Sequence, residues 1–227
     1  MLPPNQEEMY CYSKRHKWWI IIPSLLSFIG LCASQMKFAS DAPWLWWLFP
    51  FAVFALLYYV VSLSVNIFTP DFDIEHHKFS VERWQRDRFI DGMWPSADIF
   101  LPICGEPVIV LRNTWKLVLE MCKTYPGVCT VYVLDDGNSA EAKVAAETFG
   151  FTYIVRPNKG EMKKAGNMKY GYHISNGDAI LVLDADFCPN RNMLLHMLPY
   201  MWNDPRVGIV QSPQFFRECK KRVVSAF

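Results

Sequence analysis

The 227-residue sequence lacks the short motifs that identify several common functions. It contains no G-x-G-x-x-G segment and no Walker loop, which argues against the dinucleotide and ATP folds that depend on them. Its seven cysteines include no C-x-x-C pair and no zinc-finger spacing, and the pair His76-His77 is not part of an H-E-x-x-H motif. An odd, scattered set of this kind fits reduced thiols in a cytosolic domain.

Strong charge of one sign is also missing. The formal net charge is +1, and no basic stripe of the kind that contacts phosphate backbones is present. The composition therefore predicts no nucleic-acid partner. The sequence also contains no internal repeats and no low-complexity tracts, so nothing in it indicates a repeat protein.

Two uncharged apolar runs stand near the N-terminus, at residues 18–34 and 44–65. A membrane-spanning helix needs about 20 apolar residues, so the runs predict a transmembrane hairpin over residues 18–68. A cleaved signal peptide is the alternative for the first run, because basic residues precede it and Cys32-Ala33-Ser34 resembles a cleavage site. The acidic Glu7-Glu8 pair ahead of it and the longer run behind it favour the hairpin.

Basic residues flank the two runs on their outer sides, whereas only Lys37 lies between them. Since such residues accumulate on the cytoplasmic side, both ends of the hairpin are expected in the cytosol, which makes the protein a multi-pass membrane protein with a cytosolic catalytic domain. Residues 1–17 then form a cytosolic segment and residues 69–96 a juxtamembrane linker. Within that linker, residues 79–89 fit either an interfacial amphipathic helix or a plain linker helix.

From residue 97 onward, short apolar runs alternate with helical patterns. The runs are residues 97–103, 129–134, 151–155, 179–183 and 207–210. Helices are expected at 107–123, at 164–175, at 191–202, and between a capping pattern at Asn138 and a terminating Gly150. This alternation predicts an α/β fold with a mainly parallel sheet.

Acidic turns follow two of the expected strands. Asp135-Asp136-Gly137 ends the second, Asp184-Ala185-Asp186 ends the fourth, and the segment 102–107 follows the first. Ligands of such sheets bind beyond the carboxyl ends of the strands. A D-x-D pair can hold a hard divalent cation through oxygen, although short acidic turns are common and a solvated turn is the alternative.

Five motifs occur in one order along this domain. They are Pro102-x-x-Gly105-Glu106-Pro107, Asp135-Asp136-Gly137, Lys164-Ala165-Gly166-Asn167, Asp184-Ala185-Asp186 and Val210-Gln211-Ser212-Pro213-Gln214-Phe215-Phe216. Together they resemble family 2 glycosyltransferases of the cellulose-synthase group, over residues 98 to about 217. The resemblance implies a GT-A-like, Rossmann-type domain over residues 97–227, a UDP-sugar donor, a polysaccharide acceptor and Mg²⁺ or Mn²⁺.

The resemblance also implies roles for single residues. The loop from Pro102 to Glu106 is expected to line the base and ribose of the donor. Asp135 and Asp136 would contact the uridine, and Lys164 and Asn167 would face the diphosphate and the sugar. Asp184 and Asp186 would act around the metal, with Asp186 as the more direct ligand. Residues 211–216 would shape the acceptor side.

The family's general base, in a T-E-D or similar triplet, and its Q-x-x-R-W motif do not occur in this sequence. Since a base contributes about 10²–10⁴-fold to the rate, the chain is expected to be the front part of a synthase and inactive alone. Three hypotheses remain: hexose transfer, most simply from UDP-glucose to a β-glucan; UDP-sugar binding without catalysis, in association with full-length synthase subunits; and single addition to a lipid or small acceptor. Chitin-like and hyaluronan-like products stay open.

Overall fold

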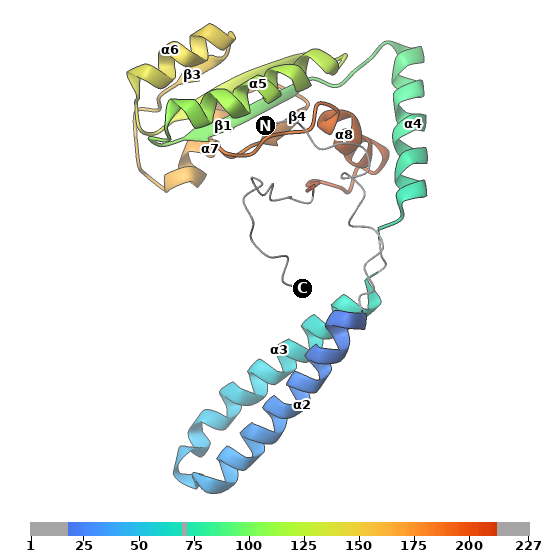
Figure 1. Cartoon of the computed structure of the whole chain (residues 1–227), viewed down its shortest axis with the longest axis vertical. Helices are drawn as coiled ribbons and strands as arrows, with labels where there is room; N and C mark the ends of the chain where they lie inside the picture. The colour runs from blue at the N-terminus through green and yellow to red at the C-terminus, as the bar shows by residue number, and fades with distance from the viewer. Residues whose placement is uncertain (1–17, 70–71, 213–227) are drawn as a thin grey trace, which may run out of the picture. The chain divides into compact units, whose positions relative to one another are not determined.

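The computed structural model describes residues 18–69 and 72–212, in two compact units that divide between His76 and His77. The first unit is a pair of long helices, and the second contains a parallel sheet with its covering helices (Figure 1).

The first unit consists of α2 (Trp18–Asp41), the 3₁₀ helix η1 (Pro43–Leu48) and α3 (Phe49–Phe68). The segments Ile21–Asp41 and Pro43–Val65 are long and apolar enough to cross a membrane by length and composition. The first helix runs seven residues past the expected end at residue 34, because nothing before Pro43 interrupts it. Phe28 and Tyr59 stack with ring centroids 5.1 Å apart, which brings α2 and α3 together.

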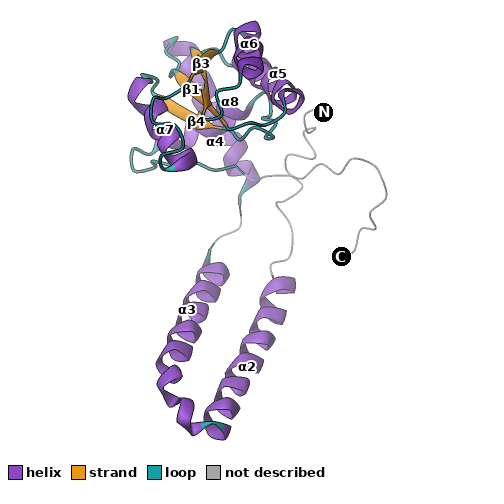
Figure 2. Ribbon diagram, turned by 90° about the vertical axis from the view of Figure 1, so that its left-hand side faces the viewer, coloured by secondary structure: helices purple, strands orange, loops and turns teal. Residues whose placement is uncertain are grey.

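The second unit confirms the expected α/β fold. Its sheet contains β1 (Ala97–Ile103), β2 (Cys129–Asp135), β3 (Thr152–Ile154) and β4 (Ala179–Val182), all parallel, in the order β3-β2-β1-β4. Helices α5 (Val108–Thr124) and α6 (Ala140–Phe149) cover one face, and α7 (Lys163–Ile174) covers the other (Figure 2). Helix α8 (Met193–Asn203) adds Leu194 and Leu198 to the core.

The core lies between the sheet and α5. Every residue of β1 is buried, as expected for a central strand covered on both faces. Helix α5 turns Leu111, Trp115 and Val118 inward at helical spacing, and all three are fully buried. The Trp115 ring meets Phe149 and Phe151 edge-on, with centroids 5.9 Å away in both cases.

Two local expectations were wrong. The N-cap of α6 is Ser139, whose Oγ accepts a hydrogen bond from the Ala142 amide (3.2 Å), whereas Asn138 adopts a left-handed conformation in the turn before it. Residues 207–210 form no strand: no described strand pairs with them, and Ile209 is 89% exposed. An apolar run becomes a strand only when a partner supplies its hydrogen bonds.

The linker after the hairpin contains helix α4 (Ile74–Asp91). Its residues His77, Val81 and Trp84 are buried. The His77 ring contacts α8 through both nitrogens, with Nδ1 2.7 Å from the Tyr200 hydroxyl and Nε2 3.0 Å from Nδ1 of His196. Burial lowers the pKa of His77 below its usual value, and the neighbouring His196 lowers it further; burial also lowers the pKa of His196.

These lowered pKa values predict that acid weakens the contact between α4 and α8. A group whose folded-state pKa is depressed contributes stability that is fully present above its unfolded pKa of about 6.5 and is lost as the pH falls toward the folded-state value. We expect the melting temperature of the full chain in detergent to fall between pH 7.5 and 5.5, and to fall less for His196→Gln. The exposed His173 gives the control His173→Gln, which should melt with the wild-type pH dependence. An identical slope for His196→Gln and wild type would contradict the prediction.

Candidate functional site

The turns that follow β1 and β2 lie against each other at one edge of the sheet. The Asp136 amide donates a hydrogen bond to the Ile103 carbonyl (3.0 Å). A Cβ on Gly137 would stand 3.0 Å from the backbone nitrogen of Gly105, so the two turns are in close contact. The chain leaving β4 stays on the same edge, because the Leu183 amide donates to the Phe100 carbonyl of β1 (3.0 Å). The three turns therefore share this edge, as the strand pattern predicts.

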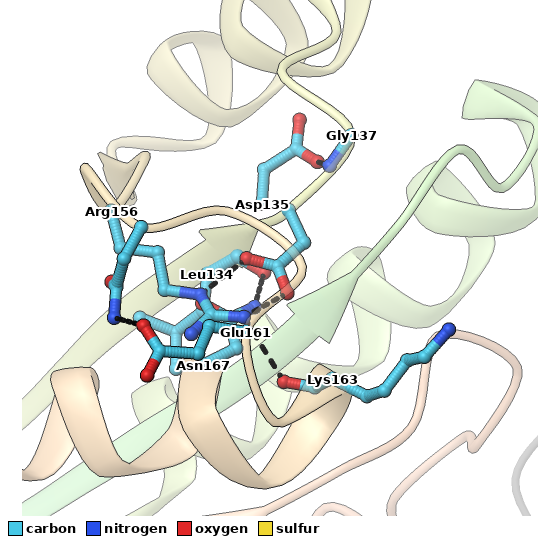
Figure 3. A network of polar contacts seen from close by, with 9 residues as sticks. Leu134, Asp135, Gly137, Arg156, Glu161, Lys163 and Asn167 are labelled. Atoms are coloured by element: carbon cyan, nitrogen blue, oxygen red, sulfur yellow. Dashed lines mark hydrogen bonds and ion pairs between the residues drawn. The ribbon is translucent and has the colours of Figure 1, made fainter.

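Asp135 is fully buried, and its carboxylate shapes the turn after β2. One oxygen accepts a hydrogen bond from the Gly137 amide (2.6 Å), and the other accepts from the Ser139 amide (2.8 Å) and the Tyr153 hydroxyl (2.6 Å). Burial raises the pKa of Tyr153, and the bond to Asp135 raises it further, so the phenol stays protonated and donates. Asp135 is thus directed into the protein, where it fixes the turn (Figure 3).

Asp136 forms a bidentate ion pair with Arg156, a residue that the sequence motifs did not indicate. Arg156 Nε lies 2.6 Å from one carboxylate oxygen and Nη2 lies 2.7 Å from the other. The Arg156 side chain is only 1% exposed, and that of Asp136 only 7%. The hydrogen bond to Asp136 raises the pKa of Arg156, so the buried guanidinium stays protonated. The sequence contained one indication of this role, because Arg156 directly follows the apolar run 151–155 and therefore lies at the same edge of the sheet as the acidic turns.

Arg156 also fixes the start of α7 (Figure 3). Its Nη2 donates to the Lys163 carbonyl (3.2 Å). A Cβ on Gly166 would stand 2.5 Å from Nη1, so the glycine gives the guanidinium its room. Met162 and Lys163 both have left-handed backbone angles, with φ of 54° and 52°. Such angles cost about 1–3 kcal/mol each in a non-glycine residue, and they persist only where surrounding contacts hold them.

Asn167 is buried beneath the edge of the sheet. It is 2% exposed, and its Nδ2 donates to the carbonyl of Leu134, the residue before Asp135 (2.7 Å). Its Oδ1 has no hydrogen-bond partner within the described part of the chain. Asn167 therefore joins α7 to the end of β2.

Lys164, Asp184 and Asp186 are the candidate residues that solvent reaches most. The Lys164 ammonium forms an ion pair with Asp184, and both side chains are about half exposed. Asp186 is exposed. Ala185 between the two acids is buried, and its carbonyl accepts a hydrogen bond from the Thr114 hydroxyl of α5 (2.8 Å). This bond pins the acidic turn to the domain.

The donor set of this turn suits a hard divalent cation, because Asp184 and Asp186 supply carboxylate oxygens within one residue of each other. Among the residues that the structure describes, no group of three or more His, Cys, Asp and Glu side chains gathers at a possible metal position. The remaining ligands would have to come from the substrate and water, which is common for Mg²⁺ at phosphates.

The other expected residues lie on β1 and in its turn. Pro102 is buried within β1, in register with Leu134, rather than in the loop after the strand. Glu106 caps that loop by accepting a hydrogen bond from the Cys104 amide (2.6 Å). Residues 213–216 of the last motif lie outside the described part of the chain. An open hollow of about 460 Å³ over the first turns of α5 and α6 includes none of the candidate residues.

The model of the glycosyl transferase family 2 matches residues 98–225, which is more than half of the chain. The chain belongs to glycosyl transferase family 2. In this family it is similar to a cellulose synthase 1 catalytic subunit (UDP-forming) of Komagataeibacter xylinus, with 37% identity over 123 residues that cover 54% of the chain and 16% of the relative. The cellulose synthase catalytic subunit (UDP-forming) of Xanthomonas axonopodis pv. citri (strain 306) is 32% identical over 124 residues, covering 55% of the chain and 17% of that relative.

The match thus spans about a sixth of each of these relatives. Among solved structures, this family 2 chain is similar to the mannosyltransferase PcManGT from Pyrobaculum calidifontis in complex with GDP-Man and Mn²⁺, at 17% identity and a TM-score of 0.42 over 59% of the chain and 43% of that structure. It is also similar to mannosyl-3-phosphoglycerate synthase from Rubrobacter xylanophilus, at 16% identity and a TM-score of 0.40 over 53% of the chain and 40% of that structure.

The buried Asp135 carboxylate predicts a stability defect in Asp135→Asn. An amide oxygen replaces at most one of the two charged acceptors, and hydrogen bonds to charged groups contribute about 1.5–3 kcal/mol each. We expect the free energy of unfolding in urea, measured on the full family 2 chain in detergent, to fall by about that amount. The control is Asp204→Asn, which breaks an exposed contact with Arg206 and should leave stability nearly unchanged. Equal stability of the two variants would contradict the structural role of Asp135.

Proposed function

We propose that this chain is the donor-binding part of a family 2 glycosyltransferase, in which a UDP-sugar binds at the carboxyl edge of the sheet and a hexose, most simply glucose from UDP-glucose, is transferred to a growing β-glucan. The observation that supports this proposal is that some charged side chains at this edge are buried and others are exposed to solvent. Asp135, Asp136 and Arg156 are buried in the scaffold, whereas Lys164, Asp184 and Asp186 remain open to solvent. The exposed side chains supply the charges that bind a nucleoside diphosphate, namely one ammonium group and two carboxylates.

In this proposal Asp184 and Asp186 hold Mg²⁺ or Mn²⁺ through their carboxylate oxygens. Such a cation would supply the positive charge that offsets the diphosphate, which the two carboxylates alone would repel. Lys164 gives up its contact with Asp184 when the donor enters and turns its ammonium toward the phosphates. Because both side chains are half exposed, that rearrangement breaks only a screened ion pair.

The uridine is placed against the two turns that Asp135 and Asp136 fix. Since the carboxylate of Asp135 already accepts three hydrogen bonds, it acts mainly by holding the turn in shape. Asp136 keeps its Arg156 partner, which sets the spacing between this turn and α7. Glu106 holds the neighbouring turn in the same way. Pro102 lies within β1 and Asn167 bonds to the end of β2, so both support the strands from which these turns leave.

The choice of a UDP donor is supported by the relatives, two of which are described as UDP-forming. Because the matched segment spans about a sixth of those proteins, the β-glucan product and any association with other synthase subunits are part of the proposal. As part of the proposal, the two apolar helices anchor the chain in a membrane and the second unit lies in the cytosol; the length of the helices and the basic residues that flank them support this topology.

The proposed cation site predicts metal-dependent UDP binding. We expect calorimetry of the full chain in detergent to show tighter UDP binding with Mn²⁺ than without it, and Asp186→Ala to remove most of the difference. The control Glu120→Ala, at an exposed position of α5, should bind like wild type, and circular dichroism checks that both variants are folded. Full metal dependence in Asp186→Ala would refute the site. Transfer of radiolabelled glucose in membranes then separates an enzyme from a non-catalytic UDP-sugar-binding protein.

The proposed hairpin predicts that Ser40, near the end of α2, faces away from the cytosol. In sealed vesicles of known orientation, Ser40→Cys should react with a membrane-impermeant maleimide only from the non-cytosolic side. The exposed Cys104 of the second unit provides an internal control, since it should react only from the cytosolic side. Reaction of both positions from one side would show that the topology is wrong.

A further inference from the structure

Cys122 lies on the side of α5 that faces the sheet. Trp115 and Val118 of that helix are fully buried in the core, and Cys122 follows them in the same stripe, because positions four and seven residues apart lie on one side of a helix. It stands in the last turn of α5, which ends at Thr124, and it packs partly buried against the core. The Cys122 thiol is therefore directed at the sheet.

Cys129 is the first residue of β2 and faces α5. Alternate residues of a strand lie on one face, so Cys129 shares its face with Val131 and Val133. Both valines belong to the same core cluster as Trp115 of α5, and Cys129 packs against that cluster. Because β1 and β2 are parallel, the helix between them runs in the opposite direction, so α5 ends beside the beginning of β2. The two thiols meet there in a hydrogen bond.

The connection between the two cysteines is held by contacts with neighbouring backbone. The Tyr125 amide donates to the Met121 carbonyl (3.0 Å), and the buried Tyr125 hydroxyl donates to the Pro95 carbonyl (2.7 Å). The Ala97 amide of β1 donates to the Val128 carbonyl (2.8 Å). These bonds fix the residues directly before both cysteines, so the two sulfur atoms stay close while the second unit is folded.

The hydrogen bond between the thiols makes the two cysteines chemically unequal. The bond from Cys129 lowers the pKa of Cys122, although burial opposes this, whereas the same bond and burial raise the pKa of Cys129. Cys122 is therefore the thiol that ionises more readily, and the thiolate is the form of cysteine that reacts with peroxides. Cys129 stays protonated beside it.

We propose that Cys122 and Cys129 form a reversible disulfide site, with hydrogen peroxide as the oxidant. The Cys122 thiolate attacks one peroxide oxygen, the O–O bond breaks, and Cys122 becomes a sulfenic acid while hydroxide leaves. The Cys129 sulfur then attacks the Cys122 sulfur, the S–S bond forms, the S–O bond breaks, and a second hydroxide leaves. The protons of the two thiols convert both hydroxide ions into water, so two thiols and one peroxide give one disulfide and two waters.

This disulfide would join α5 to β2 at the end of the sheet opposite the candidate donor site. Cys129 begins β2 and Asp135 ends it, and a strand of seven residues is about 20 Å long. A neutral disulfide also suits a partly buried place at the C-terminal end of a helix better than a thiolate does, because that end is negative. The inference rests on neither the sugar donor nor the membrane hairpin, so its failure is separate from theirs.

Peptide mapping tests the site on the full chain in detergent, because trypsin separates the two cysteines. Cleavage after Lys116, Lys123 and Lys143 gives peptide 117–123, which contains the first cysteine, and peptide 124–143, which contains the second. The chain is treated with hydrogen peroxide, free thiols are blocked with N-ethylmaleimide, and the digest is analysed without reduction. A second sample is oxidised in the presence of dimedone, which traps sulfenic acids.

We expect peptides 117–123 and 124–143 to appear joined, lighter than their sum by two hydrogen atoms, and dithiothreitol to separate them. Cys129→Ser should leave Cys122 as a dimedone adduct, several-fold more abundant than the adduct of Cys129 in Cys122→Ser. The control Cys104→Ser removes an exposed thiol at the other edge of the sheet and should form the joined peptide like wild type. A wild-type digest without the joined peptide, whether Cys122 stays free or becomes a sulfinic acid, would overturn the inference. Joining of either peptide to a different cysteine would overturn it as well.

Discussion

The buried ion pair between Arg156 and Asp136 is the contact on which the geometry of the site depends. Two charges removed from water are held by two short hydrogen bonds, and removing either partner would leave a buried charge without compensation. The same guanidinium bonds to the Lys163 carbonyl, so it ties the turn after β2 to the beginning of α7. Position 166 has room only for glycine, because a Cβ there would stand 2.2 Å from the Glu161 carbonyl oxygen and 2.5 Å from the guanidinium.

Three of the acids at the sheet edge have different roles, although they look alike in sequence. Asp135 has no contact with solvent and satisfies two amides and a phenol. Asp136 neutralises a buried arginine. Asp186 is left exposed by the acidic turn that Thr114 pins in place. The buried acids give a rigid frame, and rigid frames hold binding groups in position at little entropic cost on binding. The left-handed backbone at Met162 and Lys163 shows that this frame also holds strain directly beside Lys164.

Helix α4 is likewise held by buried contacts within the second unit. Its residue His77 bonds to Tyr200 and His196 of α8, and its Trp84 packs in the hydrophobic core, so α4 belongs to the packed body of the second unit.

The sequence by itself determined the elements and their class. Apolar runs separated by helical patterns specified a parallel sheet, and the acidic turns were placed at strand ends, because parallel strands end at one edge whatever their order. Tertiary structure decided which acids are buried, since burial depends on partners far along the chain: Tyr153 and Arg156 stand 18 and 20 residues from Asp135 and Asp136. It likewise left residues 207–210 without a strand, because the apolar pattern was present but no described partner supplied the hydrogen bonds.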